Sequence, residues 1–101
     1  MSKNPNSTLK RGLRIMKALK GKSLHGLSNL ELSRALNESE VNISRTIGAL
    51  VEEGMIQRLD NGRYAPGMQL LYIAQAFSNE MAAGQARISE LNQRVLAGSQ
   101  N

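Results

Sequence analysis

Two segments with the apolar spacing of α-helices are separated by only four residues, 37–40 (NESE). The first lies in LELSRAL, and its predicted buried side consists of Leu30, Leu32, Ala35 and Leu36. The second runs from about residue 40 to residue 53, and its predicted buried stripe consists of Ile43, Ile47, Leu50 and Val51. A connection this short forces the two helices to cross steeply, which predicts a pair of adjacent, crossed helices.

Capping residues mark the ends of both helices. Ser28, followed three positions later by Glu31, predicts a capping box at the start of the first helix. Either Ser39 or Asn37 can cap the second helix, and Gly54 stands where a left-handed C-terminal cap is expected. The helix ends are therefore predicted independently of the apolar pattern.

A further amphipathic helix is predicted ahead of this pair. Residues 1–6 (MSKNPN) are expected to be a disordered tail, after which Ser7 or Thr8 can cap the helix. Its predicted apolar side consists of Leu9, Leu13, Met16 and Leu19. Basic residues lie on a different side, at Lys10, Arg14 and Lys17. The helix is expected to end in residues 21–26 (GKSLHG), where two glycines interrupt the pattern.

A β-hairpin is predicted after the crossed pair. Residues 55–59 and 63–65 are strand candidates that flank residues 60–62 (DNG). The Asn-Gly pair is a strong hairpin signal, because both residue types accept the positive φ of a type I′ turn. The Pro-Gly pair at 66 and 67 is expected to end the second strand.

Residues 68–97 return to helical spacing and predict one kinked helix or two, followed by a frayed tail at residues 98–101. Their apolar positions are Leu70, Ala74, Phe77, Met81, Ile88, Leu91 and Val95. Such a stripe is too apolar to stay exposed in a monomer of this size. The segment is therefore predicted to combine core packing with homodimerisation.

The composition favours helices in one small domain. The 101 residues can bury one modest core, and only 3% of them are aromatic, so that core must be aliphatic. Cys is absent, which excludes disulfides, thiolate metal sites and cysteine catalysis. The apolar runs are too short to span a membrane and the N-terminus lacks a signal peptide, which predicts a cytoplasmic location.

The positive charge is concentrated near the N-terminus. The formal net charge is +5, and seven Lys and Arg residues precede the first acidic residue, Glu31. Such a segment favours binding to nucleic acid or to an anionic membrane surface, through long-range attraction and counterion release. The alternative is a solvated face that only keeps the protein soluble.

Three helices followed by a hairpin is the order of a winged helix-turn-helix, so a mostly α fold of this class is predicted for residues 7–67. In that architecture the third helix enters the major groove with its apolar stripe toward the core. The predicted base-reading residues are those left exposed in its N-terminal half, namely Val41, Asn42, Ser44 and Arg45. Arg suits guanine, Asn suits adenine, Ser suits bases or phosphates, and Val can meet a thymine methyl.

Other residues are predicted to support this interface. Gly48 would let the third helix approach the DNA backbone, or alternatively pack closely against another helix. Glu38 and Glu40 are interpreted mainly as partners of the helix dipole, with contact to cytosine as a minor alternative. Residues predicted to contact the DNA backbone or the minor groove are Ser28, Ser39, Lys10, Arg14, Lys17, Arg58 and Arg63. For Arg63, a partner within the hairpin such as Asp60 is an equal alternative.

Parts of the chain also resemble a known family. The runs TLKRGLRIMKAL and GLSNLELSRALNESEVNISRTIGALVEEGMIQRLDNGRYAPGMQLL are similar to the DNA-binding domain of IclR-type bacterial transcription factors, over about residues 7–77. The resemblance implies a winged helix, a dimer formed around the first helix and the helices after the wing, and operator binding through the third helix. By position, Asn42, Ser44 and Arg45 match the base- and phosphate-contacting segment of the family, and Arg63 matches its wing.

The chain departs from the family pattern at three positions. Glu38 stands where the family usually has an apolar residue, Glu40 where a basic residue is common, and Val41 where a small hydroxyl residue is common. Sequence specificity therefore cannot be transferred from the family. The chain also does not continue into the effector-binding domain of the family, which suggests a compact phage-type or mobile-element regulator without an inducer site, or a fragment.

The sequence thus predicts a small homodimeric transcriptional regulator, a repressor or an activator, that binds specific double-stranded DNA in the bacterial nucleoid or in a phage-infected cell. No cofactor, metal or membrane partner is predicted. An enzyme is disfavoured, because the only His, His25, lies in a Gly-flanked loop without a Cys or a second His. The alternatives are a winged-helix protein-interaction module that works through residues 68–95, and a replication or partition accessory protein.

Overall fold

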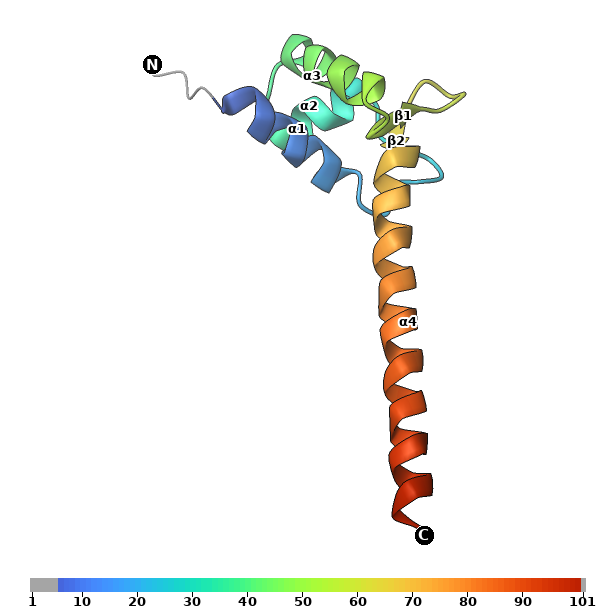
Figure 1. Cartoon of the computed structure of the whole chain (residues 1–101). Helices are drawn as coiled ribbons and strands as arrows, with labels where there is room; N and C mark the ends of the chain where they lie inside the picture. Colours follow the sequence, from blue (N-terminus) through green and yellow to red (C-terminus); the bar gives the residue numbers. More distant parts are fainter. Residues whose placement is uncertain (1–5, 101) are drawn as a thin grey trace. The chain divides into compact units, whose positions relative to one another are not determined.

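The computed structural model describes residues 6–100, so most of the predicted tail at residues 1–6, and residue 101, lie outside the described residues. Within that range the elements are α1 (Ser7–Ala18), α2 (Asn29–Leu36), α3 (Glu40–Glu52), β1 (Ile56–Arg58), β2 (Tyr64–Pro66) and α4 (Met68–Ser99) (Figure 1). The chain divides after Leu71 into two compact units. The predicted mostly helical fold with a two-stranded wing is confirmed.

The core of the first unit is aliphatic, as the low aromatic content predicts. Its buried side chains come from α1, α2, α3 and β1, and they are Ile15, Leu19, Leu32, Leu36, Ile43, Ile47 and Ile56. Tyr64 and Leu27 pack against this cluster from the wing and from the loop before α2. The cluster fixes the inner side of α3, and it therefore also determines which residues α3 presents to solvent.

The turn between α2 and α3 is held by hydrogen bonds at both of its ends. Asn37 adopts the left-handed conformation, with φ of 55°, as the C-terminal cap of α2. The carbonyl of Ser33 accepts a hydrogen bond from the Glu38 amide at 3.0 Å, and the Ser33 hydroxyl donates to the Glu38 carbonyl at 2.5 Å. Ser39 then caps α3 by accepting from the Asn42 amide. The crossing of the two helices is thus set within three residues of chain.

Most of the predicted caps are confirmed. The Ser28 and Glu31 capping box is formed at α2, and Gly54 is left-handed, with φ of 76°, just after α3. The prediction for α1 is wrong, because the helix begins at Ser7 and Asn6 occupies the capping position.

The buried side of α1 differs in part from the predicted one. Gly12 and Ile15 are buried, whereas Leu9 and Leu13 are 62% and 47% exposed. A Cβ added at Gly12 would lie 3.6 Å from the methyl carbon of Thr46, so the glycine lets α1 pack closely on α3. The helix therefore turns its Gly12 side inward, and Leu9 and Leu13 form a leucine stripe that faces outward. Of the predicted apolar side, Leu19 is buried and Met16 is half-buried.

Part of the predicted buried face of α2 and α3 is exposed as well. Leu30 and Ala35 of α2 are exposed, because this eight-residue helix buries only the side that carries Leu32 and Leu36. In α3, Val51 is 39% exposed and Leu50 is half-buried, while Thr46 is buried at 4%. The helix ends at Glu52, one residue earlier than predicted.

The wing is an antiparallel hairpin with a different turn from the predicted type I′. Its strands pair Ile56 with Pro66 and Arg58 with Tyr64. Gly62 has a positive φ of 83°, but Asn61 does not, and the Leu59 amide donates to the Arg63 carbonyl at 2.7 Å. This is the three-residue loop in which a turn is followed by one left-handed residue. The wing is also tied to the loop before α2 by two backbone hydrogen bonds between Leu27 and Tyr64.

The C-terminal segment is a single α-helix, α4, which settles the predicted choice between one helix and two. It includes residues 98 and 99, which were expected in a frayed tail. No residue of α4 is buried among the described residues. Leu70, within the first unit, is half-buried.

Candidate nucleic-acid interface

The outer side of α3 carries exposed residues that include Val41, Ser44, Arg45 and Gly48. Their spacing of three, one and three residues places them on one side of a helix, opposite Ile43 and Ile47. Three of the four predicted base-reading residues therefore share one solvent-facing surface, and Asn42 lies beside it, half-buried. This surface is called the outer face of α3 below.

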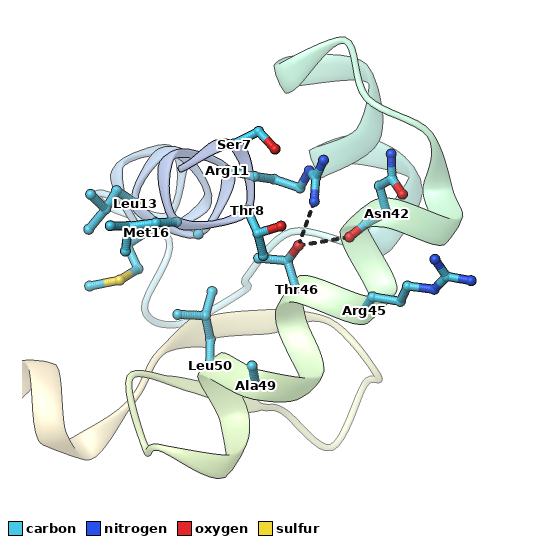
Figure 2. Close-up of a pocket in the computed structure, with 12 residues that line it drawn as sticks. Ser7, Thr8, Arg11, Leu13, Met16, Asn42, Arg45, Thr46, Ala49 and Leu50 are labelled. Atoms are coloured by element: carbon cyan, nitrogen blue, oxygen red, sulfur yellow. Dashed lines mark hydrogen bonds between the residues drawn. The ribbon is translucent and has the colours of Figure 1, made fainter. Parts of the chain in front are cut away.

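Arg45 is the unpaired cation of this face. Its side chain has no hydrogen-bond or ionic partner within residues 6–100, and Figure 2 shows it extending away from α1. A planar guanidinium with all its N–H donors available suits bidentate contact with guanine O6 and N7, or with a phosphate.

Gly48 has no packing role that would explain it. A Cβ added there would meet no atom within 4 Å, so the alternative of close packing against another helix is wrong. A glycine inside a helix costs about 0.5–1 kcal/mol relative to alanine. On an exposed face, such a glycine leaves room for another molecule to approach the helix backbone.

Ser44 belongs to a short chain of hydrogen bonds between α2 and α3. Its hydroxyl donates to Asn29 Oδ1 at 3.2 Å, and Asn29 Nδ2 donates to the Glu40 carbonyl at 3.3 Å. The same nitrogen lies 3.5 Å from the Glu40 carboxylate, which is in the first turn of α3 where the helix dipole favours it. Asn29 had not been predicted as part of the site, although its place right after the capping Ser28 indicates the end of α2 that faces α3.

Asn42 is held by Glu38 of the preceding turn. Its Nδ2 donates to Glu38 Oε1 at 3.3 Å, and the same carboxylate oxygen lies 3.4 Å from Nε of Arg11. Glu38 stands before the Ser39 cap and pairs with Arg11, so its interpretation as mainly a dipole partner is wrong. Arg11 was also missed as a site residue, although it stands four positions before Ile15 on the buried side of α1.

The residues predicted to contact the DNA backbone differ in whether their side chains are free to bind DNA or are already engaged within the protein. The side chains of Lys10 and Lys17 are exposed and have no polar partner among the described residues. Arg14 donates to the Leu36 carbonyl at 3.0 Å, so it joins α1 to the end of α2. Ser28 and Ser39 accept backbone hydrogen bonds as helix caps, which leaves their hydroxyl hydrogens able to donate outward.

Arg63 is bound within the protein. It forms a 2.6 Å ion pair with Glu31 and donates to the carbonyls of His25 and Gly26, at 3.0 and 3.3 Å. The alternative pairing with Asp60 is wrong, because Glu31 of α2 is the partner. Arg58 is exposed near the tip, where one of its terminal nitrogens would lie 3.6 Å from a Cβ at Gly62. Arg58 is thus the more available cation of the wing.

Glu31 connects the wing to α2 and has a perturbed pKa. The hydrogen bond from the Ser28 amide lowers the pKa of Glu31 below its usual value, burial opposes this, and the Ser28 hydroxyl and the Arg63 guanidinium lower it further. The carboxylate is therefore ionised at neutral pH and keeps Arg63 on the protein. This contact fixes the base of the wing relative to α2.

A groove of about 690 Å³ lies between α1 and α3 (Figure 2). Apolar side chains line much of it, including Leu9 and Leu13 of α1 and Leu50 of α3. Asn42 and Arg45 also line it, so the apolar groove adjoins the outer face of α3. The leucine stripe that α1 turns outward is therefore part of a concave surface.

The second unit presents an apolar stripe of its own along α4. Its largest members are exposed: Phe77 62%, Met81 55%, Ile88 56%, Leu91 43% and Val95 70%. From residue 74 to residue 95 the stripe advances by three and four residues alternately, with Ala74 and Gly84 as its small members. This is the 3.5-residue repeat of a helix that packs along another helix.

Across residues 6–100, no group of three His, Cys, Asp or Glu side chains could hold a metal ion. Over the same range, no helix is both long and apolar enough to cross a membrane.

These features define a winged helix-turn-helix with an exposed face on its third helix. Among solved structures, the chain is similar to CymR, the global cysteine regulator of B. subtilis, with 26% sequence identity and a TM-score of 0.55. The match covers 66% of this chain and 53% of CymR, so it spans about half of that protein. CymR is a winged-helix regulator and not an enzyme.

No protein-family model matches the chain, and no curated protein matches it. The comparisons support a winged-helix regulator without supporting the IclR type in particular.

Proposed function

We propose that this protein is a DNA-binding regulator of transcription that reads double-stranded DNA through the outer face of α3. The observation that carries the proposal is the combination of an unpaired Arg45 with Gly48, a helix glycine that has open space before it. An arginine that can donate to guanine suits a helix in the major groove, and a glycine on the same face permits close approach of that helix. The similarity to CymR supports the same class of function.

The remaining contacts supply affinity. Arg58 of the wing reaches the DNA backbone or the minor groove, and Lys10 and Lys17 of α1 attract phosphates. Arg63 contributes indirectly, because its contacts with Glu31 and the loop before α2 hold the wing in place.

The functional form is a homodimer that packs α4 of one copy along α4 of another. Support comes from the 3.5-residue repeat of exposed apolar residues along α4. The outward leucines of α1 add apolar surface of the kind that the resemblance to IclR-type regulators assigns to a dimer. A two-fold dimer binds two half-sites about one turn of DNA apart, which implies a palindromic operator. The regulator acts in the cytoplasm, where operator DNA is found in bacteria.

The proposal is tested by titrating the protein with a random duplex and with a duplex selected from a random pool, at about 50 and 200 mM salt. A DNA reader binds both duplexes at low salt, loses affinity steeply as salt rises and prefers the selected sequence. Failure to bind any duplex at the lower salt concentration would refute the proposal. The exposed stripe of α4 would then favour a protein-interaction module.

A further inference from the structure

Four residues from α1, the turn before α3, and α3 form a closed ring of polar contacts. Glu38 Oε1 accepts from Asn42 Nδ2 at 3.3 Å and lies 3.4 Å from Arg11 Nε. Arg11 also donates from Nη1 to Thr46 Oγ1 at 3.3 Å. Thr46 in turn donates to the Asn42 carbonyl at 2.9 Å, and Figure 2 shows both hydrogen bonds of Thr46. The ring joins the side chain of Asn42 to its own main chain through three other residues.

The ring is largely shielded from solvent. The side chains of Arg11 and Glu38 are 14% and 23% exposed, and Thr46 is buried. Arg11 Nε is buried without a hydrogen-bond partner in residues 6–100, so the Glu38 carboxylate is what compensates it. A buried ion pair often stabilises a fold no better than apolar residues of similar volume. The presence of an ion pair at this place is therefore better explained by a role in positioning the Asn42 amide than by a contribution to stability.

The Glu38 carboxylate determines which way this amide faces. An ionised carboxylate only accepts hydrogen bonds, so the nitrogen of the amide, and not its oxygen, must face Glu38. Asn42 Oδ1 has no partner within the described part of the chain, and Nδ2 keeps a second N–H. A free amide oxygen beside a free N–H is the pattern that pairs with N6 and N7 of adenine in the major groove.

We propose that Arg11 and Glu38 are positioning residues that hold Asn42 in the amide orientation that reads an A·T base pair. The inference rests on the proposed function, since it concerns how the same α3 recognises DNA. Arg11 also neutralises Glu38, so a carboxylate stands at the start of the reading helix without an uncompensated charge near the phosphates. Neither residue contacts DNA, and both act through Asn42.

The test compares the double variant R11M/E38M with Asn42→Ala and with the triple variant. The probe is the duplex that the wild-type protein selects from a random pool, together with versions substituted at one base pair at a time. The wild-type protein is expected to prefer A·T at one position by about 5- to 150-fold. The double variant and Asn42→Ala should each lose this preference, and the triple variant should lose no more than Asn42→Ala does.

Thermal melting distinguishes a variant that has lost the orientation of Asn42 from one that has lost its fold. The double variant is expected to melt at the wild-type temperature or above it, because apolar side chains of similar volume replace the ion pair. If it does not fold, Glu38→Gln serves instead, since a glutamine can donate to a rotated Asn42 amide and should weaken the preference. Glu53→Gln is the matched control, because Glu53 is exposed at the opposite end of α3 and does not contact Asn42, and it should keep the preference.

Three results would overturn the inference while DNA binding itself stands: an unchanged preference in the folded double variant, an unchanged preference in Asn42→Ala, or an additional loss in the triple variant. The last would mean that Glu38 acts independently of Asn42. Failure of the wild-type protein to bind any duplex would instead overturn the proposed function and this inference with it.

Discussion

At the scale of single residues, Arg45 is expected to determine sequence specificity, while the lysines of α1 contribute only sequence-independent affinity. Replacing Arg45 by Ala should cost about 1–3 kcal/mol on the selected duplex and relax one position of the recognised sequence. Lys17→Ala should weaken binding to a similar extent on every sequence, because phosphate contacts carry no base information. Competition binding with singly substituted duplexes measures both effects. Equal weakening of all sequences by Arg45→Ala would make Arg45 a phosphate contact.

Gly48 allows a test in which stability and binding move in opposite directions. Gly48→Ala should stabilise the fold by about 0.5–1 kcal/mol, because alanine is the better helix residue and a Cβ there meets no atom. The same methyl group should weaken binding to the selected duplex if α3 approaches DNA through this position. Thermal melting and a duplex titration measure the two effects. Unchanged affinity in the more stable variant would show that Gly48 is not at the DNA contact.

At the scale of elements, the wing depends on the ion pair between Glu31 and Arg63. Since the folded state lowers the pKa of Glu31, the pair stabilises the protein above the ordinary glutamate value of about 4.3, and this contribution is lost as the pH falls through the lowered pKa. At pH 7, Glu31→Gln should therefore melt at a lower temperature than the wild-type protein. This gap in melting temperature should close as the solution becomes acidic. Melting curves from pH 7 to pH 3 measure the gap. A gap that stays constant over this range would contradict the role of the charge.

The elements themselves were largely predictable from the sequence, because caps and periodicity are local. Ser28 with Glu31, Ser39 and Gly54 mark helix ends wherever the helices pack. The buried side of α1 was not predictable, since two adjacent apolar stripes compete and only the approach of α3 at Gly12 decides between them. The hairpin turn was also mispredicted.

The same distinction between local and tertiary information applies to the candidate site. The outer residues of α3 followed from the spacing of Ile43 and Ile47. The partners of Glu38 and Arg63 did not, because Arg11 and Glu31 lie on other helices and reach them only through tertiary packing. The sequence could therefore predict which residues face outward, but not which of them the fold already engages.

At the scale of the whole molecule, dimerisation through α4 can be separated from DNA reading. Ile88→Glu places a charge within the apolar stripe and should convert a dimer into monomers, with a large loss of affinity for a palindromic duplex. Ala86→Glu adds the same charge outside the stripe and should leave both properties unchanged. Sedimentation at micromolar concentration reports the assembly state. A wild-type protein that stays monomeric at that concentration would contradict both the predicted dimer and the palindromic operator.

The central claim, that the outer face of α3 meets DNA, is tested most directly by amide NMR of the labelled protein during titration with the selected duplex. The expected result is that the largest shifts fall on residues 41–48 and at the wing near Arg58, with smaller ones near Lys10 and Lys17. Shifts confined to α4, or to the α1 side of the groove at Leu9 and Leu13, with residues 41–48 unmoved, would contradict it.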